Sequence, residues 1–164
     1  MAGGDVSVAG EASDGAVDDT PQNASAFSYI HDNQVVGTVS YGIAFTAGHD
    51  NVATNNRVIS SGLLSDRTKI AAQRAGLINS NAHGDGGSAY NNNMHDNLAG
   101  WTCWSASCAQ QGYRQDQYFP AATGDYSSNP VVSAKQITLE MEEGEYSIWM
   151  DKVAAAGIKV GPSF

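Results

Sequence analysis

The sequence predicts an all-β protein in which short strands form stacked coils, with one helix near the C-terminal end. Glycine accounts for 18 of the 164 residues and asparagine is clustered, which predicts many tight turns. An irregular internal repeat runs through residues 23–101, as stacked coils require. Residues 138–156 carry the start and stop signals of a helix.

Composition restricts the classes of function. A hydrophobic fraction of 41% suits a single folded domain of 164 residues. The net charge of −9, from 17 acidic and 8 basic residues, repels phosphate backbones, so no nucleic-acid partner is expected. Acidic polysaccharides would need a bridging cation. No apolar run approaches the roughly 20 residues that a membrane span needs.

Residues 1–22 are rich in Gly, Ala and Asp and show no clear period. They are predicted to form a flexible N-terminal segment or a first coil, with a candidate strand at 5–9. The start of the chain lacks the basic and apolar stretches of an export signal. Met1 is interpreted as replacing such a signal or an upstream portion of the protein.

The predicted coils occupy residues 23–101, where three segments align: 26–33, 54–61 and 90–97. Short strands separated by Asn and Gly turns would let each coil bury its inward residues against the next, about 4.8 Å away.

Two internal ladders are expected from that alignment. Ile30, Val58 and Met94 would stack as an apolar ladder. Asn56 and Asn92, two residues earlier on the same face, would form an asparagine ladder. Amides that bond along the stack satisfy each other in a buried place.

The C-terminal helix is expected to begin at the capping residue Thr138, to run through Ala156 and to end at Gly157. Its larger apolar residues lie near one face, and they are Met141, Ile148, Trp149 and Val153. The helix would cover coil surface or an open end, because an exposed sheet edge invites aggregation.

Three patterns resemble a known architecture: Gly-Ile-x-Phe at 42–45, Asn-Asn-x-Val-Ile-x-Ser-Gly at 55–62 and Asn-Asn-Asn-Met-x-Asp-Asn at 91–97. An acidic helix with a Trp, followed by Ala-Gly-Ile-x-Val-Gly-Pro, completes the resemblance. The chain is similar to the C-terminal part of bacterial exported right-handed parallel β-helix proteins of the pectate-lyase-like superfamily.

The resemblance implies a right-handed parallel β-helix of about three to four short coils with a C-terminal capping α-helix. Residues 102–164 would then form a long packing loop plus the helix, in the same domain as the coils. The superfamily includes lyases, hydrolases, epimerases, tailspikes and adhesins, so it implies a carbohydrate partner without fixing an activity.

A mixed aromatic and polar surface is predicted on the outside of the coils. His31 and His95 would hold the same outward position two coils apart, with Ile59 between them. Aromatic planes beside polar groups suit sugar, and a solvated face or loop packing is the alternative. The predicted ligand-binding residues are Tyr29, His31, Arg57, Asn93, His95 and Trp104.

A seven-residue offset from a glycine to a histidine occurs twice, and it would place His49 and His83 at equivalent turns on adjacent coils. With Asp50 and Asp85 beside them, they could hold a divalent metal, either calcium or a transition metal. The alternative is turn chemistry, because Asp and Asn side chains cap turns. No other cofactor is predicted.

An insertion between coils carries three of the eight basic residues, Arg67, Lys69 and Arg74. β-Elimination of a uronate needs a base and a cation that stabilises the developing charge, and β-helix lyases resemble this when they use Lys or Arg with calcium. The alternative is an exposed insertion that balances nearby acidic residues.

Cys103 and Cys108 have four residues between them, which is not the spacing of redox or zinc motifs. A disulfide that closes a surface loop is favoured over free thiols, and it would imply an oxidising compartment.

These observations lead to three hypotheses. The first is a secreted or cell-surface protein that binds or cleaves polysaccharide, which as an enzyme would be a polysaccharide lyase or a glycoside hydrolase. The second is a structural, adhesive or tailspike-like module. The third is a metal-dependent enzyme that uses the turn His and Asp residues. An exposed coil end also predicts a homo-oligomer.

Overall fold

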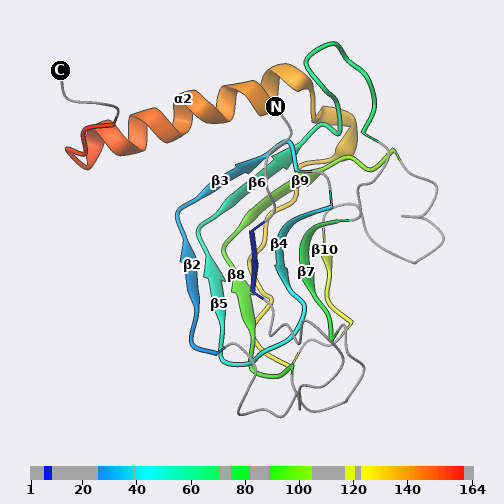
Figure 1. Cartoon of the computed structure of the whole chain (residues 1–164), viewed down its shortest axis with the longest axis vertical. Helices are drawn as coiled ribbons and strands as arrows, with labels where there is room; N and C mark the ends of the chain where they lie inside the picture. Colours follow the sequence, from blue (N-terminus) through cyan, green and yellow to red (C-terminus); the bar gives the residue numbers. More distant parts are fainter. Residues whose placement is uncertain are drawn as a thin grey trace, which may run out of the picture.

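The computed structural model describes residues 6–8, 26–38, 40–70, 75–81, 89–104, 117–120 and 123–160. These residues form mostly strands, which lie in three parallel sheets, followed by one α-helix (Figure 1). The prediction of an all-β chain with a C-terminal helix is therefore confirmed.

The three sheets each take every third strand of the chain. The first sheet has the order β1 (Val6–Val8), β4 (Tyr41–Phe45), β7 (Ala75–Asn79), β10 (Gln117–Tyr118). The second has the order β2 (Tyr29–His31), β5 (Val52–Thr54), β8 (Asn93–His95). The third has the order β3 (Gln34–Val36), β6 (Arg57–Ser60), β9 (Leu98–Trp101). One passage through all three sheets is called a circuit below.

The register differs from the predicted alignment. Ile30 pairs with Ala53 and Ala53 with Met94, in the second sheet. Val58 belongs to the third sheet, where it pairs with Val35 and Ala99. The predicted ladder of Ile30, Val58 and Met94 is therefore wrong. Each circuit has one corner before the second sheet and another between the second and third sheets, and asparagine side chains bond at both. The predicted alignment matched an asparagine of one corner with an asparagine of the other.

Asparagine side chains form the ladders at both corners. Between the second and third sheets, Asn56 donates its backbone N–H and Nδ2 to Asn97 Oδ1, at 3.1 and 2.9 Å. Asn33 bonds to Asn56 in the same way, and Asn97 to Asn129. Asn92 belongs to the other corner, where it accepts from Asn51. Asparagine ladders are therefore present, but the predicted ladder that joins Asn56 to Asn92 is wrong, because the two residues lie at different corners.

The residue before each ladder position has a positive φ, which reverses the chain direction locally. Asp and Asn hold most of these corner positions, and they adopt this conformation more readily than other non-glycine residues. The φ angles are 57° at Asp32, 55° at Asn55 and 57° at Asp96 at one corner, and 54° at Asp50 and 50° at Asn91 at the other.

Parts of residues 102–136, which were expected to form an outer loop, join the stack instead. The strand β10 pairs with β7 in the first sheet. Asn129 then accepts from Asn97, and Val131 forms a bridge with Ala99. Tyr126 packs against the main core. These segments extend the stack by a fourth circuit.

The core lies inside the circuits. Gly42 allows the first sheet to approach the third, because an added Cβ would lie 2.1 Å from Val58 Cγ1 and 2.5 Å from the Gly76 oxygen. The buried cluster at the centre consists of Val35, Ile43, Phe45, Ala53, Val58, Leu77, Met94, Ala99 and Trp101.

The helix α2 (Leu139–Ala155) confirms its predicted ends. Thr138 accepts a hydrogen bond from the Met141 backbone N–H at 3.1 Å, and Gly157 follows the helix with a φ of 68°. A short 3₁₀ helix, η1 (Ala134–Gln136), precedes it. In the part of the chain that the structure describes, no helix combines the length and apolar character that crossing a membrane requires.

The face that α2 buries matches the predicted apolar one only in part. Val153 is buried on it, and Met141 and Trp149 are half-buried, but Ile148 is exposed. Glu142 and Glu145, which were not predicted there, are buried as well. Glu145 accepts from Arg57 Nε and Nη2, both at 2.7 Å, and Glu142 accepts from the Ser61 backbone N–H at 2.6 Å. Hydrogen bonds thus place α2 across β6 and β3, and its C-terminal part runs on past β3 (Figure 1).

We expect Asn56→Ala to lower the free energy of unfolding by about 3 kcal/mol, because several buried groups lose their partners. Asn33→Ala, at the exposed end of the same ladder, should cost only about 1 kcal/mol. Urea denaturation followed by circular dichroism measures both. Equal losses for the two variants would contradict the buried ladder.

Arg57→Ala should destabilise the protein by about 3–5 kcal/mol, because it leaves the Glu145 carboxylate buried without a partner. The Glu145 side chain is only 1% exposed, against 28% for Arg57. The matched control is Arg67→Ala, which removes the exposed pair with Glu140 and should cost less than about 1 kcal/mol. A comparable loss in both variants would show that the Arg57 pair does not hold the helix.

Candidate functional site

The outer face of the second sheet brings four of the predicted ligand-binding residues together. Register places Tyr29, Val52 and Asn93 in one row and His31, Thr54 and His95 in the next. The residues between them, such as Ala53 and Met94, point inward and are buried. Thr54, and not the predicted Ile59, lies between the two histidines. The term "outer face" below means the side chains of Tyr29, His31, Val52, Thr54, Asn93 and His95.

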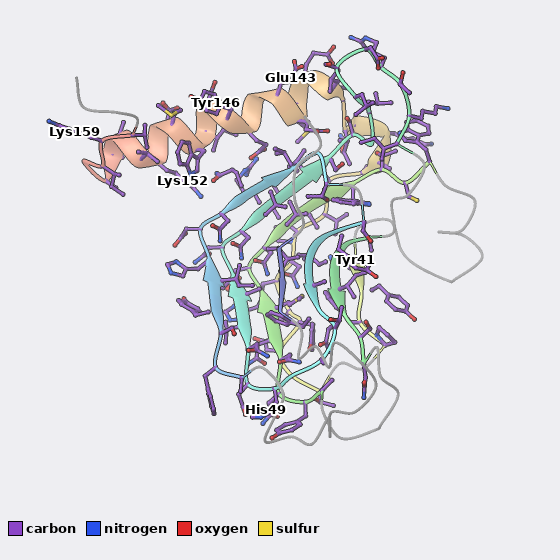
Figure 2. The ribbon with its side chains drawn as sticks, in the orientation of Figure 1. Tyr41, His49, Glu143, Tyr146, Lys152 and Lys159 are labelled. Atoms are coloured by element: carbon purple, nitrogen blue, oxygen red, sulfur yellow. The ribbon has the colours of Figure 1, made fainter. Side chains whose placement is uncertain are left out.

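Stacked rings line this face and the adjoining corner. The Tyr29 and His31 rings are stacked, with centroids 4.5 Å apart. At the corner before the second sheet, the His49 ring stacks on Tyr90 at 4.5 Å and meets Phe27 edge-on at 5.9 Å. Figure 2 shows His49 at this corner. Phe27 and Tyr90 were not predicted, because the pairing of His49 with Ala26 and Tyr90 appears only once the register is known.

Each described histidine bonds to the aspartate that follows it. The Nδ1–Oδ2 distances are 2.7 Å for His31–Asp32 and His49–Asp50. The third pair, His95–Asp96, has a distance of 2.8 Å. An ionised carboxylate can only accept, so Nδ1 is the donor in each pair.

These pairs occupy defined places in the circuit. The histidine ends a strand or lies at a bridge, the aspartate has the positive φ of the corner, and the next asparagine enters a ladder. The hydrogen bond from His49, together with a weaker one from Asn91 at 3.2 Å, lowers the pKa of Asp50 below its ordinary value. His-Asp-Asn therefore has the corner role that was the alternative to metal binding.

The predicted metal site is only partly described. His49 and Asp50 lie at the corner, whereas His83 and Asp85 lie outside the described residues. The bridge partner of His49 in the next circuit is Tyr90. Among the residues with described positions, no three His, Cys, Asp or Glu side chains are grouped so that they could hold a metal ion.

Arg57 does not share the outer face. Arg57 lies on the third sheet beneath α2, where the Glu145 carboxylate accepts hydrogen bonds from its Nε and Nη2. These bonds raise the pKa of the Arg57 guanidinium. Arg57 does face outward, but the prediction that it shares one strand face with Tyr29 and Asn93 is wrong, because the second corner of the circuit separates these residues.

The described part of the basic insertion between β6 and β7 contacts α2 and Trp104 and not the outer face. Arg67 Nη2 bonds to Glu140 at 2.6 Å, near the start of α2. Lys69 Nζ lies 4.2 Å from the centroid of the Trp104 ring, and Trp104 Nε1 donates to the Ser61 oxygen. Leu63 and Lys69 form an antiparallel bridge, so the insertion folds back on itself.

These contacts give Lys69 and Trp104 a shared structural role. Neither is brought to the outer face, so Trp104 is not part of the same sugar surface as Tyr29. Arg74 lies outside the described residues. The proposed lyase role of the three basic residues stays a prediction.

The described cysteine, Cys103, is buried and is not free. Cys108 lies outside the described residues. The disulfide between the two therefore stays a prediction.

No protein-family model, curated protein or solved structure is significantly similar to this chain. The resemblance to the pectate-lyase-like superfamily accordingly stays a prediction from the sequence patterns. Evidence about function comes from the described residues themselves.

The His49–Asp50 hydrogen bond makes stability depend on pH. Because the pKa of Asp50 is lowered from 3.8, its contribution is fully present above pH 3.8 and is lost as the pH falls through the lowered pKa. Asp50→Asn keeps a residue that tolerates positive φ but lacks the charge. We expect the wild type to melt at a higher temperature than this variant at pH 7, and the difference to shrink and disappear as the pH falls below 3.8 through the lowered pKa of Asp50.

Asp151→Asn is the matched control, since it removes one negative charge from the exposed face of α2. Thermal melts of the three proteins across this pH range measure the effect. A gap between the wild type and Asp50→Asn that persists at the lowest pH would contradict the role of the ionised carboxylate.

Proposed function

We propose that this chain is a right-handed parallel β-helix that binds polysaccharide on the outer face of its second sheet. Its parallel sheets and its three-sheet circuit support this architecture, because parallel crossovers within one sheet are right-handed in nearly all proteins. The proposal includes secretion or display at a cell surface.

The observation that carries the proposal is the regular arrangement of ring and polar side chains on the outer face. The rows Tyr29–Val52–Asn93 and His31–Thr54–His95 cross adjacent strands about 4.8 Å apart. Tyr29 is 61% exposed. An open face of this kind suits an extended polymer, whereas small ligands are usually enclosed in concave pockets.

Charge narrows the type of polysaccharide. Aspartates adjoin the outer face at Asp32, Asp96 and Asp125, and the chain has a net charge of −9. Hydrogen bonds from the Ser127 backbone and side chain keep the pKa of Asp125 below its ordinary value, so it is ionised at neutral pH. We therefore expect a neutral or amine-bearing polysaccharide in preference to a polyanion.

Binding is favoured over cleavage. Glycoside hydrolysis needs two carboxyl groups on either side of the scissile bond. The aspartates nearest the outer face are instead used in the fold: Asp32 and Asp96 pair with the preceding histidines at the corners, and Asp125 accepts from the Ser127 backbone N–H. Arg67 and Lys69 are held at α2 and Trp104. The outer face thus offers contacts to sugar without an evident acid–base pair.

Tyr29→Ala should weaken polysaccharide binding about five- to tenfold, because an aromatic contact contributes roughly 1 kcal/mol beyond buried area. Native affinity electrophoresis in gels containing β-glucan, mannan or chitosan measures the retardation. Tyr146→Ala is the matched control, because Tyr146 is similarly exposed, at 67%, but lies on α2. Retardation that Tyr29→Ala leaves unchanged, or no retardation of the wild type by any of the three polymers, would overturn the proposal.

A further inference from the structure

A groove separates α2 from β3 at the edge of the third sheet. Its walls include Gln34 and Val36 of β3 and Glu143, Tyr146 and Trp149 of α2, and it encloses about 300 Å³. Figure 2 marks Glu143, Tyr146 and Lys152 along the helix. These five lining residues define the "edge groove" below.

The strand beside the groove, β3, pairs with a described strand on one side only. Among the described residues, β3 and β2 are the terminal strands of their sheets. Arg57 N–H donates to the Asn33 oxygen, and Gln34 is the register partner of Arg57. In a parallel ladder this pattern leaves the backbone N–H and C=O of Gln34 and Val36 facing away from β6. An edge of this kind is a template for another strand.

The asparagine ladder reaches this edge with a defined polarity. Each member donates toward the next circuit and accepts from the previous one, as in the bonds from Asn33 to Asn56 and from Asn56 to Asn97. Asn33 is the first member, and its Oδ1 accepts no bond from any described residue. Among the described residues, the ladder therefore ends on an exposed amide oxygen, which can accept a hydrogen bond from the N–H of an added backbone.

Side chains in the groove point to the same kind of occupant. Both polar atoms of the Gln34 amide are shielded from solvent and have no partner among the described residues. The Tyr146 and Trp149 rings lie 6.3 Å apart and give an apolar wall. Glu143 is exposed and makes no ion pair with a described residue, which favours a basic side chain opposite it.

The third sheet already shows how such a side chain would be bound. Arg57 is the register partner of Gln34, faces outward and bonds to Glu145 of α2. If another strand paired with β3 on the side away from β6, its residue opposite Gln34 would face outward like Arg57. That side chain would lie at the edge groove. Lys152 fastens the helix to the corner before β3, since its Nζ lies 3.4 Å from the Asp32 carbonyl oxygen.

We infer that the edge groove binds an extended segment of another polypeptide, which adds to β3 as a parallel strand. Its backbone donates to Asn33 Oδ1 and pairs with Gln34 and Val36, and a basic side chain meets Glu143. This is strand addition combined with a helix-lined pocket. It is independent of polysaccharide binding on the outer face.

A labelled peptide with the sequence of residues 51–60 of this chain is the probe, because that segment pairs with β2 and β3 on their other side and contains Arg57. Fluorescence anisotropy should show saturable binding to the full chain. Glu143→Lys should weaken it about fivefold or more, as reversal of a charge opposite a cation does. Asp151→Lys carries the same charge change on the exposed face of α2 and should leave binding unchanged.

Hydrogen exchange identifies the mode of binding. Bound peptide should slow the exchange of the Gln34 and Val36 amides, and a peptide with N-methylated backbone positions should neither bind nor protect them. Tyr29→Ala should bind the peptide as the wild type does. Absence of binding at millimolar peptide, or equal binding by Glu143→Lys and Asp151→Lys, overturns the inference. Sedimentation that shows a dimer, with both amides protected before peptide is added, overturns it in favour of a second copy at this edge.

Discussion

The structure depends on the hydrogen bond between a corner N–H and an asparagine side chain of the adjoining circuit. Where the chain leaves one sheet for the next, the residue before the corner has a positive φ and the backbone N–H that follows needs an acceptor along the stack. Asn56, Asn97 and Asn129 supply that acceptor at distances of 3.0–3.1 Å. A buried N–H without an acceptor is costly, so these side chains fix where each circuit turns.

The same corners decide which surfaces are open. The third sheet begins after the corner that holds Asn33, Asn56 and Asn97. It is covered by α2, because Arg57 and Ser61 donate hydrogen bonds to buried glutamates on the helix. In the described part of the chain, no helix covers the second sheet, and Tyr29 is largely exposed on it. The third sheet thus holds the helix, while rings and polar groups on the second sheet stay at the surface.

Sequence reasoning found the elements more readily than their relations. Thr138 and Gly157 gave the helix ends because capping is local in sequence. The register failed because Asn33 and Asn51 mark different corners with the same residue type, and because circuit lengths vary. On α2, the burial of Val153 was predicted, but that of Glu142 and Glu145 was not, because their partners lie 81 and 88 residues away. Likewise, Tyr90 joined His49 only through long-range pairing.

The circuits differ greatly in length although their closing bonds do not. Successive ladder asparagines are 23, 41 and 32 residues apart, yet each pair bonds with nearly the same geometry. The hydrogen bond between two ladder asparagines therefore returns the chain to the stack, whatever the length of the segment between them. Such a scaffold is evolvable by insertion: new loops can be acquired or grafted between β6 and β7 without altering the strands that support them.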